Sequence, residues 1–144
     1  MISKHITYEE ATRTNSGLEN TPSETHLAAM AYLAENVFEP LRNHFNKPIA
    51  VTSFFRSNAV NKAIGGANSS QHTRGQAMDI DGHVLGGVSN SEIFHFIKDN
   101  LQFDQLIWEN GNDKEPDWVH VSLKHIGNRG EVLRKLKGGS YIRL

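Results

Sequence analysis

Apolar residues recur at intervals of three and four through the first third of the chain, in the order Leu27, Met30, Ala34, Val37, Leu41 and Phe45. This spacing places them on one face of a long helix. At its start Thr21 can act as the cap, Pro22 suits the first helical position and Glu24 completes a capping box. Pro40 lies inside the apolar pattern, so we expect the helix to bend or split there.

After this helix the chain changes to short segments, some with strand-like alternation and some with helical spacing. Predicted strands cover residues 49–53, 76–81, 103–108, 118–123 and 141–143, and predicted helices cover residues 58–64 and 89–100. The second of these helices begins with a capping box made by Ser89 and Glu92. Residues 1–20 are polar and are expected to form extended chain and turns. Strands and helices mix without a regular βαβ order, which favours a single α+β domain over residues 1–144.

Composition restricts the chemistry that such a domain can perform. The chain has 144 residues, a net charge of -1, eight histidines and no cysteine. Disulfides and thiolate metal sites are therefore excluded, and a metal would have to be held by imidazole and carboxylate groups. The balanced charge gives no indication of a nucleic-acid or anionic-membrane surface.

The first residues contain no apolar stretch of the kind found in signal peptides, and no segment has the length of a membrane span. We therefore expect synthesis in the cytoplasm without a signal peptide. A substrate outside the cell would require another route of delivery.

A histidine and an aspartate flank a turn in the middle of the chain. His72 precedes Gly75, whose freedom lets the chain reverse tightly or pass close to another backbone. Asp79 follows in a predicted strand, where alternation puts it on the same face as Ala77 and Asp81. The small side chain of Ala77 leaves space on that face. His72 and Asp79 can therefore converge on one point.

A second histidine lies on a later predicted strand. His120 alternates with Val119 and Val121, so it should point away from the core. Asp117 has the opposite parity to His120 if the strand runs through it. Pro116 instead favours an entering loop, from which the Asp117 side chain is free to turn toward a metal.

Two histidines and one carboxylate are the usual three-ligand set of a catalytic zinc, and His72, Asp79 and His120 supply such a set. The fourth position is then left for a water, whose pKa the metal lowers toward neutrality. A nearby carboxylate would serve as general base. We predict Asp117 for this role, with Glu115 as the alternative. The other interpretation of the three ligands is an ordinary polar cluster.

A recognisable motif covers these residues: Ser70-x-His72-x-x-Gly75-x-Ala77-x-Asp79, followed by Trp118-x-His120. It resembles the M15 family of zinc D-Ala-D-Ala carboxypeptidases and related L-Ala-D-Glu endopeptidases, which includes phage and bacterial cell-wall peptidases. Residues 51–57 and 61–66 are also similar to the family, and the resemblance extends over roughly residues 37–123. Phe55 departs from the pattern, because many relatives have tyrosine there. This change removes one possible hydrogen bond but no catalytic group.

The resemblance implies a small antiparallel sheet flanked by helices, with the zinc site on the sheet face, as in the hedgehog/D-Ala-D-Ala peptidase-like fold. It implies zinc ligation by His72, Asp79 and His120. It also implies that Asp117 is the catalytic carboxylate and that Arg56 binds substrate and stabilises the developing oxyanion. A guanidinium suits that role because it is always charged and donates in a fork; the alternative for Arg56 is a surface ion pair. The resemblance further implies that Ser70 lines the site and contacts substrate.

The remaining candidates receive structural interpretations. We interpret Glu109 as the end of a strand rather than a catalytic group, Asp81 as a supporting or solvent-facing carboxylate, and Trp118 as packing or a wall of the site. The histidines outside the motif are expected to be structural or exposed, and they are His5, His26, His44, His83, His95 and His125.

We therefore predict a monomeric zinc metallopeptidase, a hydrolase that cleaves peptide bonds in peptidoglycan stem peptides, for example as an endolysin in cell wall degradation. Its expected site of action is the cell wall after release from the cell, with no nucleic-acid partner and no membrane span. The alternative is a catalytically silent zinc-containing binding or structural module of the same fold, for example in a phage particle. Carboxypeptidase, dipeptidase and endopeptidase activities all stay open, because loops decide how the ends of the cleft are closed.

Overall fold

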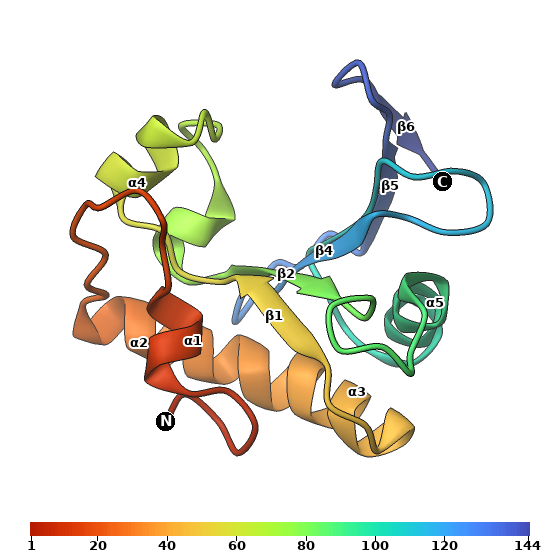
Figure 1. Cartoon of the computed structure of the whole chain (residues 1–144), viewed down its shortest axis with the longest axis horizontal. Helices are drawn as coiled ribbons and strands as arrows, with labels where there is room; N and C mark the ends of the chain where they lie inside the picture. Colours follow the sequence, from red (N-terminus) through yellow and green to blue (C-terminus); the bar gives the residue numbers. More distant parts are fainter.

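The computed structural model describes residues 1–144 as a single α+β domain built on one mixed sheet of six strands (Figure 1). The strands are β1 (Ala50–Ser53), β2 (Ala77–Asp81), β3 (Gln105–Glu109), β4 (Trp118–Ser122), β5 (Glu131–Lys135) and β6 (Tyr141–Arg143). Their order across the sheet is β1-β2-β4-β3-β5-β6. All neighbours are antiparallel except β3 and β5, which run parallel. The predicted α+β class is confirmed, and the antiparallel expectation holds for four of the five strand pairs.

Helices lie on both sides of this sheet. The helical segments are α1 (Tyr8–Thr12), α2 (Glu24–Leu33), the π-helical η1 (Ala34–Phe38), α3 (Glu39–Phe45), α4 (Asn58–Ala63), the 3₁₀-helical η2 (Gln71–Arg74) and α5 (Asn90–Asn100). Figure 1 shows α2, η1 and α3 as one rod beneath the sheet, with α5 beside it. The α4 region and the β5–β6 hairpin rise on the opposite side, at the two ends of the sheet.

The long helix begins later than its sequence predicts. Ser23, not Thr21, is the cap: its hydroxyl accepts a hydrogen bond from the backbone N–H of His26, and the His26 ring accepts one from the Ser23 N–H. The third helical position is therefore His26, so Glu24 cannot complete the capping box. The predicted Thr21–Glu24 cap is wrong because His26 supplies the reciprocal hydrogen bond.

Next to Pro40 the backbone hydrogen bonding of this helix changes from α-helical to π-helical, but the helix is not split. The five residues before α3 form the π-helical segment η1, and Pro40 sits in the first turn of α3. A proline lacks a backbone N–H and cannot bond to the preceding turn. A π-helical segment is one way in which a helix accommodates such a local change.

Three elements were not predicted, and the first is the 3₁₀-helical η2, which precedes the turn expected at Gly75. Residues 1–20 contain the short helix α1 as well as turns, and residues 131–135 form β5. Every residue of β5 is half-buried, so neither face of the strand is clearly inside or outside. Its sequence accordingly lacks the alternation of apolar and polar residues by which a strand is recognised. The predicted strands at the positions of β1 to β4 and β6, and the helices at α4 and α5, are confirmed.

The core lies between the sheet and the rod of α2, η1 and α3, and it continues toward α5. It is one cluster of 25 buried apolar residues, to which β2, β3 and β4 each contribute. Fully buried members include Phe38 and Leu41 from the rod and Ile80 and Val121 from the sheet. Because the core occupies this face of the sheet, the other face carries the polar residues that line the cleft described below.

None of the helices has the length and apolar character that a membrane crossing requires.

Candidate metal centre and cleft

His72 lies in η2, on the cleft side of the sheet, and a hydrogen bond to the backbone fixes its ring. Its Nδ1–H donates to the Phe54 carbonyl over 2.7 Å, and the side chain is buried. Because a carbonyl oxygen can only accept, Nδ1 carries a proton, and Nε2 is the ring nitrogen that faces Asp79. This is the arrangement in which a histidine binds a metal through Nε2.

The turn that carries His72 depends on a glycine. Gly75 closes η2 in the left-handed region with φ of 73°. A Cβ at this position would lie 2.7 Å from the His26 carbonyl oxygen and 2.8 Å from Cγ of Met30. Both the backbone conformation and the close approach to α2 therefore require glycine.

Asp79 and His120 are brought together by strand register. They are directly paired residues of the antiparallel strands β2 and β4. Their side chains lie on the same face, with Nδ1 of His120 3.1 Å from Oδ1 of Asp79. On the other face the neighbouring residues Ile80 and Val119 are buried in the core. Alternation along two adjacent strands thus positions two of the three predicted ligands.

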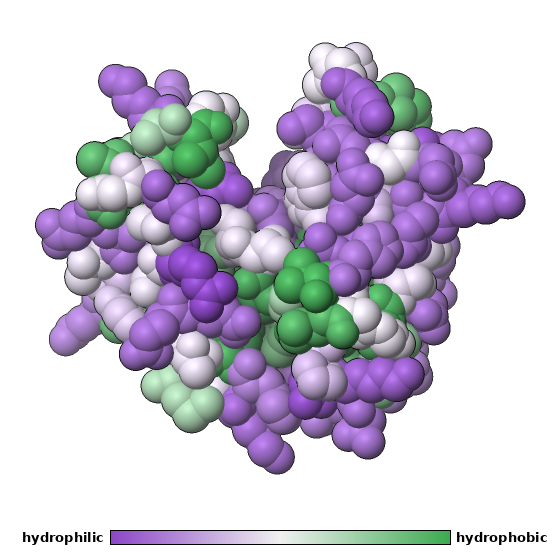
Figure 2. All heavy atoms as spheres, in the orientation of Figure 1, coloured by the Kyte–Doolittle hydropathy of each residue, from purple (hydrophilic) through white to green (hydrophobic).

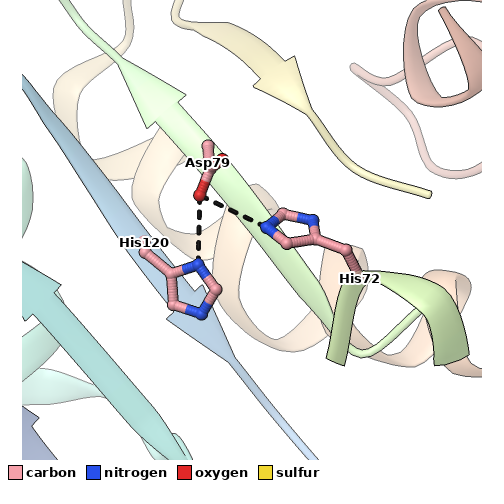
Figure 3. Close-up of side chains that lie close together, drawn as sticks. All are labelled: His72, Asp79 and His120. Carbon is pink, nitrogen blue, oxygen red and sulfur yellow. Dashed lines mark hydrogen bonds and ion pairs between the residues drawn. The ribbon is translucent and has the colours of Figure 1, made fainter. Parts of the chain in front are cut away.

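The three predicted ligands converge on one point (Figure 3). Oδ1 of Asp79 lies 3.4 Å from Nε2 of His72 and 3.1 Å from Nδ1 of His120, and all three ligand atoms lie within 4.8 Å of one another. His72 and Asp79 are buried and His120 is partly buried. Two imidazole nitrogens and one carboxylate oxygen are the donor set that catalytic zinc prefers. The residues therefore fit a divalent metal of this kind.

The electrostatics of Asp79 agree with this role. Burial by itself would raise the pKa of its carboxyl group. The charge of His72 and hydrogen bonds from His120 and His72 outweigh burial and hold the pKa of Asp79 well below its usual range. Asp79 is therefore ionised at neutral pH, as a metal ligand must be.

Arg56 holds the second oxygen of the same carboxylate. Its Nη2 lies 3.3 Å from Oδ2 of Asp79, its Nε donates to Oγ of Ser53, and its Nη1 to Oδ1 of Asn61. Burial lowers the pKa of the guanidinium, while the charges of Asp79 and Glu109 oppose that shift. Arg56 therefore lies beside the candidate metal site and also lines the cleft described below.

An open cleft of about 730 Å³ leads to these residues. Figure 2 shows it as a notch between the part of the molecule that carries α4 and the part that carries β5 and β6, with mainly hydrophilic walls. The segment after α4, residues 65–70, lies on one side, and Lys135 and Tyr141 on the other. The volume falls in the range of roughly 300–1,000 Å³ that is typical of ligand sites.

Charges in this cleft are unevenly divided. Five of its lining side chains are cationic, namely Arg56, Arg74, Lys124, Arg129 and Lys135, and three are carboxylates, namely Asp79, Asp104 and Glu109. The chain as a whole has a net charge of -1. The cleft is therefore more positive than the rest of the molecule, which favours an anionic ligand.

Glu109 occupies an unexpected position on the cleft face of β3. It is 6% exposed and lines the cleft together with His120. Burial raises the pKa of its carboxyl group; the charges of His120, Lys135 and Arg56 act in the opposite direction, and that of Asp79 adds to the rise. The sequence identifies Glu109 as the end of a strand and gives little indication of a catalytic role.

The other predicted carboxylates lie elsewhere. Asp117 is exposed and is not among the residues that line the cleft. Both oxygens of Glu115 accept backbone N–H groups at the start of α5, from Asn90 and Ser91. Glu115 also pairs with His83, so its carboxylate is used in holding the chain. The catalytic role of Asp117 stays a prediction.

Ser70 lies where its predicted role requires. It lines the cleft, and its hydroxyl accepts a hydrogen bond from the backbone N–H of His72. It thus begins the turn that presents His72. Its contact with substrate stays a prediction.

The histidines outside the motif do not join the metal cluster. His5 pairs with the buried Glu39, His26 caps α2, and His83 pairs with Glu115. The cleft also contains residues that the sequence did not indicate, above all Lys135 and Tyr141. Their position follows from the pairing of β5 with β3 and of β6 with β5.

Comparison with known proteins identifies the family. A search of curated proteins finds no match to the chain. The family model of Peptidase M15 matches residues 4–122, which contain His72, Asp79 and His120. The match covers most of the chain and includes every strand that carries a ligand. On this evidence, the chain belongs to the M15 peptidase family.

Proposed function

We propose that this protein is a zinc-dependent peptidase that hydrolyses peptide bonds in the stem peptides of peptidoglycan. The observation that carries the proposal is the convergence of Nε2 of His72, Oδ1 of Asp79 and Nδ1 of His120 at the floor of an open cleft. Among common divalent metals, zinc suits two imidazoles and one carboxylate in a site that keeps a position free. Bound there, zinc would polarise a carbonyl and acidify a water.

The charge of the cleft supports a wall peptide as substrate. Stem peptides carry free carboxylates, and the cleft presents five cationic side chains. Two of these, Arg74 and Lys135, form no ion pair with a protein carboxylate and are available to a ligand. A peptide with free carboxylates is therefore drawn to the cleft and oriented in it.

Arg56 would bind the substrate from the side of Asp79. Its guanidinium is fixed by Ser53 and Asn61, and the side chain is 17% exposed and lines the cleft. A charged donor held in place can stabilise the oxyanion that forms when water adds to a carbonyl. Ser70, at the start of η2, would contact the peptide beside it.

Proton transfer also requires a carboxylate. Asp117 is the sequence-based proposal, three residues before His120. Its exposure outside the cleft lining weighs against it. If no carboxylate served, the protein would be the silent zinc-containing module that is the second candidate.

We propose the cell wall as the site of action, reached after release of the protein from the cytoplasm. The substrate is polymeric and external, and the cleft is open to large ligands. The protein is expected to act as a monomer.

The proposal is tested by digesting purified peptidoglycan with the zinc-loaded protein and identifying the muropeptides by mass spectrometry. We expect about one zinc per chain and zinc-dependent release of a peptide or of D-alanine, and the products identify the bond that is cut. His120→Ala should lose both zinc and turnover. Arg56→Lys should keep zinc and lose turnover by on the order of a hundredfold, because lysine keeps the charge but not the fork.

Two results would reject parts of this proposal. Full zinc occupancy in His120→Ala would show that the ligand set is wrong. A wild-type protein that holds zinc but releases nothing from any wall preparation would favour the silent module.

A further inference from the structure

Glu109 lies on the cleft face of the sheet, next to the metal centre. In β3, Leu106 and Trp108 are buried in the core, whereas Ile107 and Glu109 line the cleft. Ile107 is paired with His120 across β4, and Glu109 with Trp118. Glu109 is therefore the diagonal neighbour of His120 on one face of an antiparallel pair, a relationship that long side chains can bridge.

The Glu109 carboxylate has no structural partner. Its Oε2 is buried and forms no hydrogen bond within the protein. Nearly all buried polar atoms in folded proteins are hydrogen-bonded, so an exception calls for an explanation. By contrast, both oxygens of Asp79 are engaged, one by His120 and one by Arg56. Glu109 is the cleft carboxylate that is left available for a ligand.

Neither of the carboxylates closer to His120 in sequence occupies a comparable position. Asp117 touches Glu109 only through the backbone: its N–H donates to the Glu109 carbonyl over 2.9 Å. Its own carbonyl accepts from the Asn90 side chain, and its side chain is exposed. Glu115 is fully used at the start of α5. The strand that precedes the loop, and not the loop itself, presents a carboxylate to the cleft.

We propose that Glu109 is the catalytic carboxylate of this peptidase, an assignment that rests on the proposed function. Glu109 removes one proton from the attacking water as the water oxygen bonds to the carbonyl carbon of the scissile peptide. The C–N bond then breaks, and Glu109 returns that proton to the departing nitrogen, which leaves as an amine. The carboxylate is unchanged after one cycle, and water has been added across the peptide bond.

Two amide substitutions compare the candidates directly. Glu109→Gln and Asp117→Asn each remove a negative charge and keep the size of the side chain. On a peptidoglycan preparation that the wild type digests, Glu109→Gln should lower kcat by on the order of a hundredfold or more, with KM within about threefold and zinc content unchanged. Asp117→Asn tests the other candidate, and Asp113→Asn, at an exposed carboxylate outside the cleft lining, is the matched control and should stay within about threefold of wild-type kcat. Wild-type kcat in Glu109→Gln, or a hundredfold loss in Asp117→Asn alone, would overturn the assignment.

A measurement without turnover separates this role from a structural one and from the choice of substrate. Acetohydroxamic acid is a small neutral acid that binds zinc as its anion. Calorimetry of its binding to zinc-loaded protein, in buffers of different ionisation enthalpy, counts the protons released. In the wild type and in Asp117→Asn the proton should pass to Glu109, with little release to the buffer. Glu109→Gln should release about one proton per ligand bound.

The outcomes distinguish the two proposals. Equal proton release by wild type and Glu109→Gln would reject Glu109 as the proton acceptor, whatever the enzyme cleaves. A wild type that shows the proton difference but digests no wall peptide would instead reject the proposed substrate and leave the acceptor identified.

Discussion

Strand β3 carries a buried carboxylate at each end, and the two are held in different ways. Asp104 precedes the strand and is fully buried, but it accepts three hydrogen bonds from Arg129 and one from Gln71. Glu109 ends the strand, and no side-chain partner satisfies its buried oxygen. Both line the same cleft. The comparison indicates that the Asp104 carboxylate stabilises the fold, whereas the Glu109 carboxylate is free to act on a ligand.

The pKa values of the two carboxyl groups differ in the same sense. Hydrogen bonds from the Arg129 side chain, against the opposing effect of burial, hold the pKa of Asp104 well below its usual range. Burial raises the pKa of Glu109. A buried charge is tolerated where hydrogen bonds replace its water, and it is costly where they do not. Ionised Asp104 therefore stabilises the fold, whereas ionised Glu109 destabilises it.

The largest effect on stability is expected at the Asp104 end. Asp104→Asn should lower the free energy of unfolding by about 2 kcal/mol, because it weakens a charge-assisted network. Urea denaturation at pH 7 measures the change. Asp113→Asn is the matched control, since Asp113 forms an ion pair with Arg134 but is 91% exposed, and it should change stability little. Equal effects of the two substitutions would show that burial does not distinguish these pairs.

A smaller change in the free energy of unfolding is expected on acidification. The pKa of Asp104 is lowered by folding, so its contribution is complete above the ordinary value of about 3.9 and is lost as the pH falls below it. The stability gap between wild type and Asp104→Asn should therefore be equal at pH 7 and pH 5 and should narrow below about pH 4. Denaturant titrations across this range test the sign. A gap that widened in acid would contradict the assignment of the shift.

The smallest effect on stability is expected at Glu109. Glu109→Gln should leave the free energy of unfolding unchanged or raise it by up to about 1 kcal/mol, because the substitution removes a buried charge that has no partner. Thermal or urea unfolding in the presence of a chelator measures this without a metal contribution. Destabilisation as large as that of Asp104→Asn would show that Glu109 forms a stabilising interaction of its own. The contrast between Asp104 and Glu109 would then be lost.

The sequence was sufficient to bring together the three residues of the candidate metal site, because local patterns determine their positions. Alternation around Asp79 and His120 placed both on the polar face of their strands, and the position of Gly75 indicated a turn that could return His72 to them. The start of the long helix was misplaced because the capping partner is a histidine ring, which the usual Ser/Thr–Glu/Gln pattern does not include.

The remainder of the cleft depends on contacts between distant segments. Leu106, Ile107 and Trp108 are all apolar, so alternation could not show which face of β3 Glu109 shares. The pairing of β5 with β3 is parallel and follows a long connection, and no local pattern determines it. Lys135 enters the cleft through this pairing alone. The residues that were missed are therefore those whose position is decided by tertiary structure.

The hairpin of β5 and β6 stands outside the segment that defines the family. The M15 match ends at residue 122, so His72, Asp79 and His120 lie inside the matched segment, whereas Lys135 and Tyr141, which line the cleft, lie beyond it. The hairpin joins the sheet at β3 and supplies no ligand. Because the hairpin lines the cleft but gives no residue to the candidate metal site, exchanging its residues is a way for an engineer to alter specificity while keeping the three predicted ligands in place.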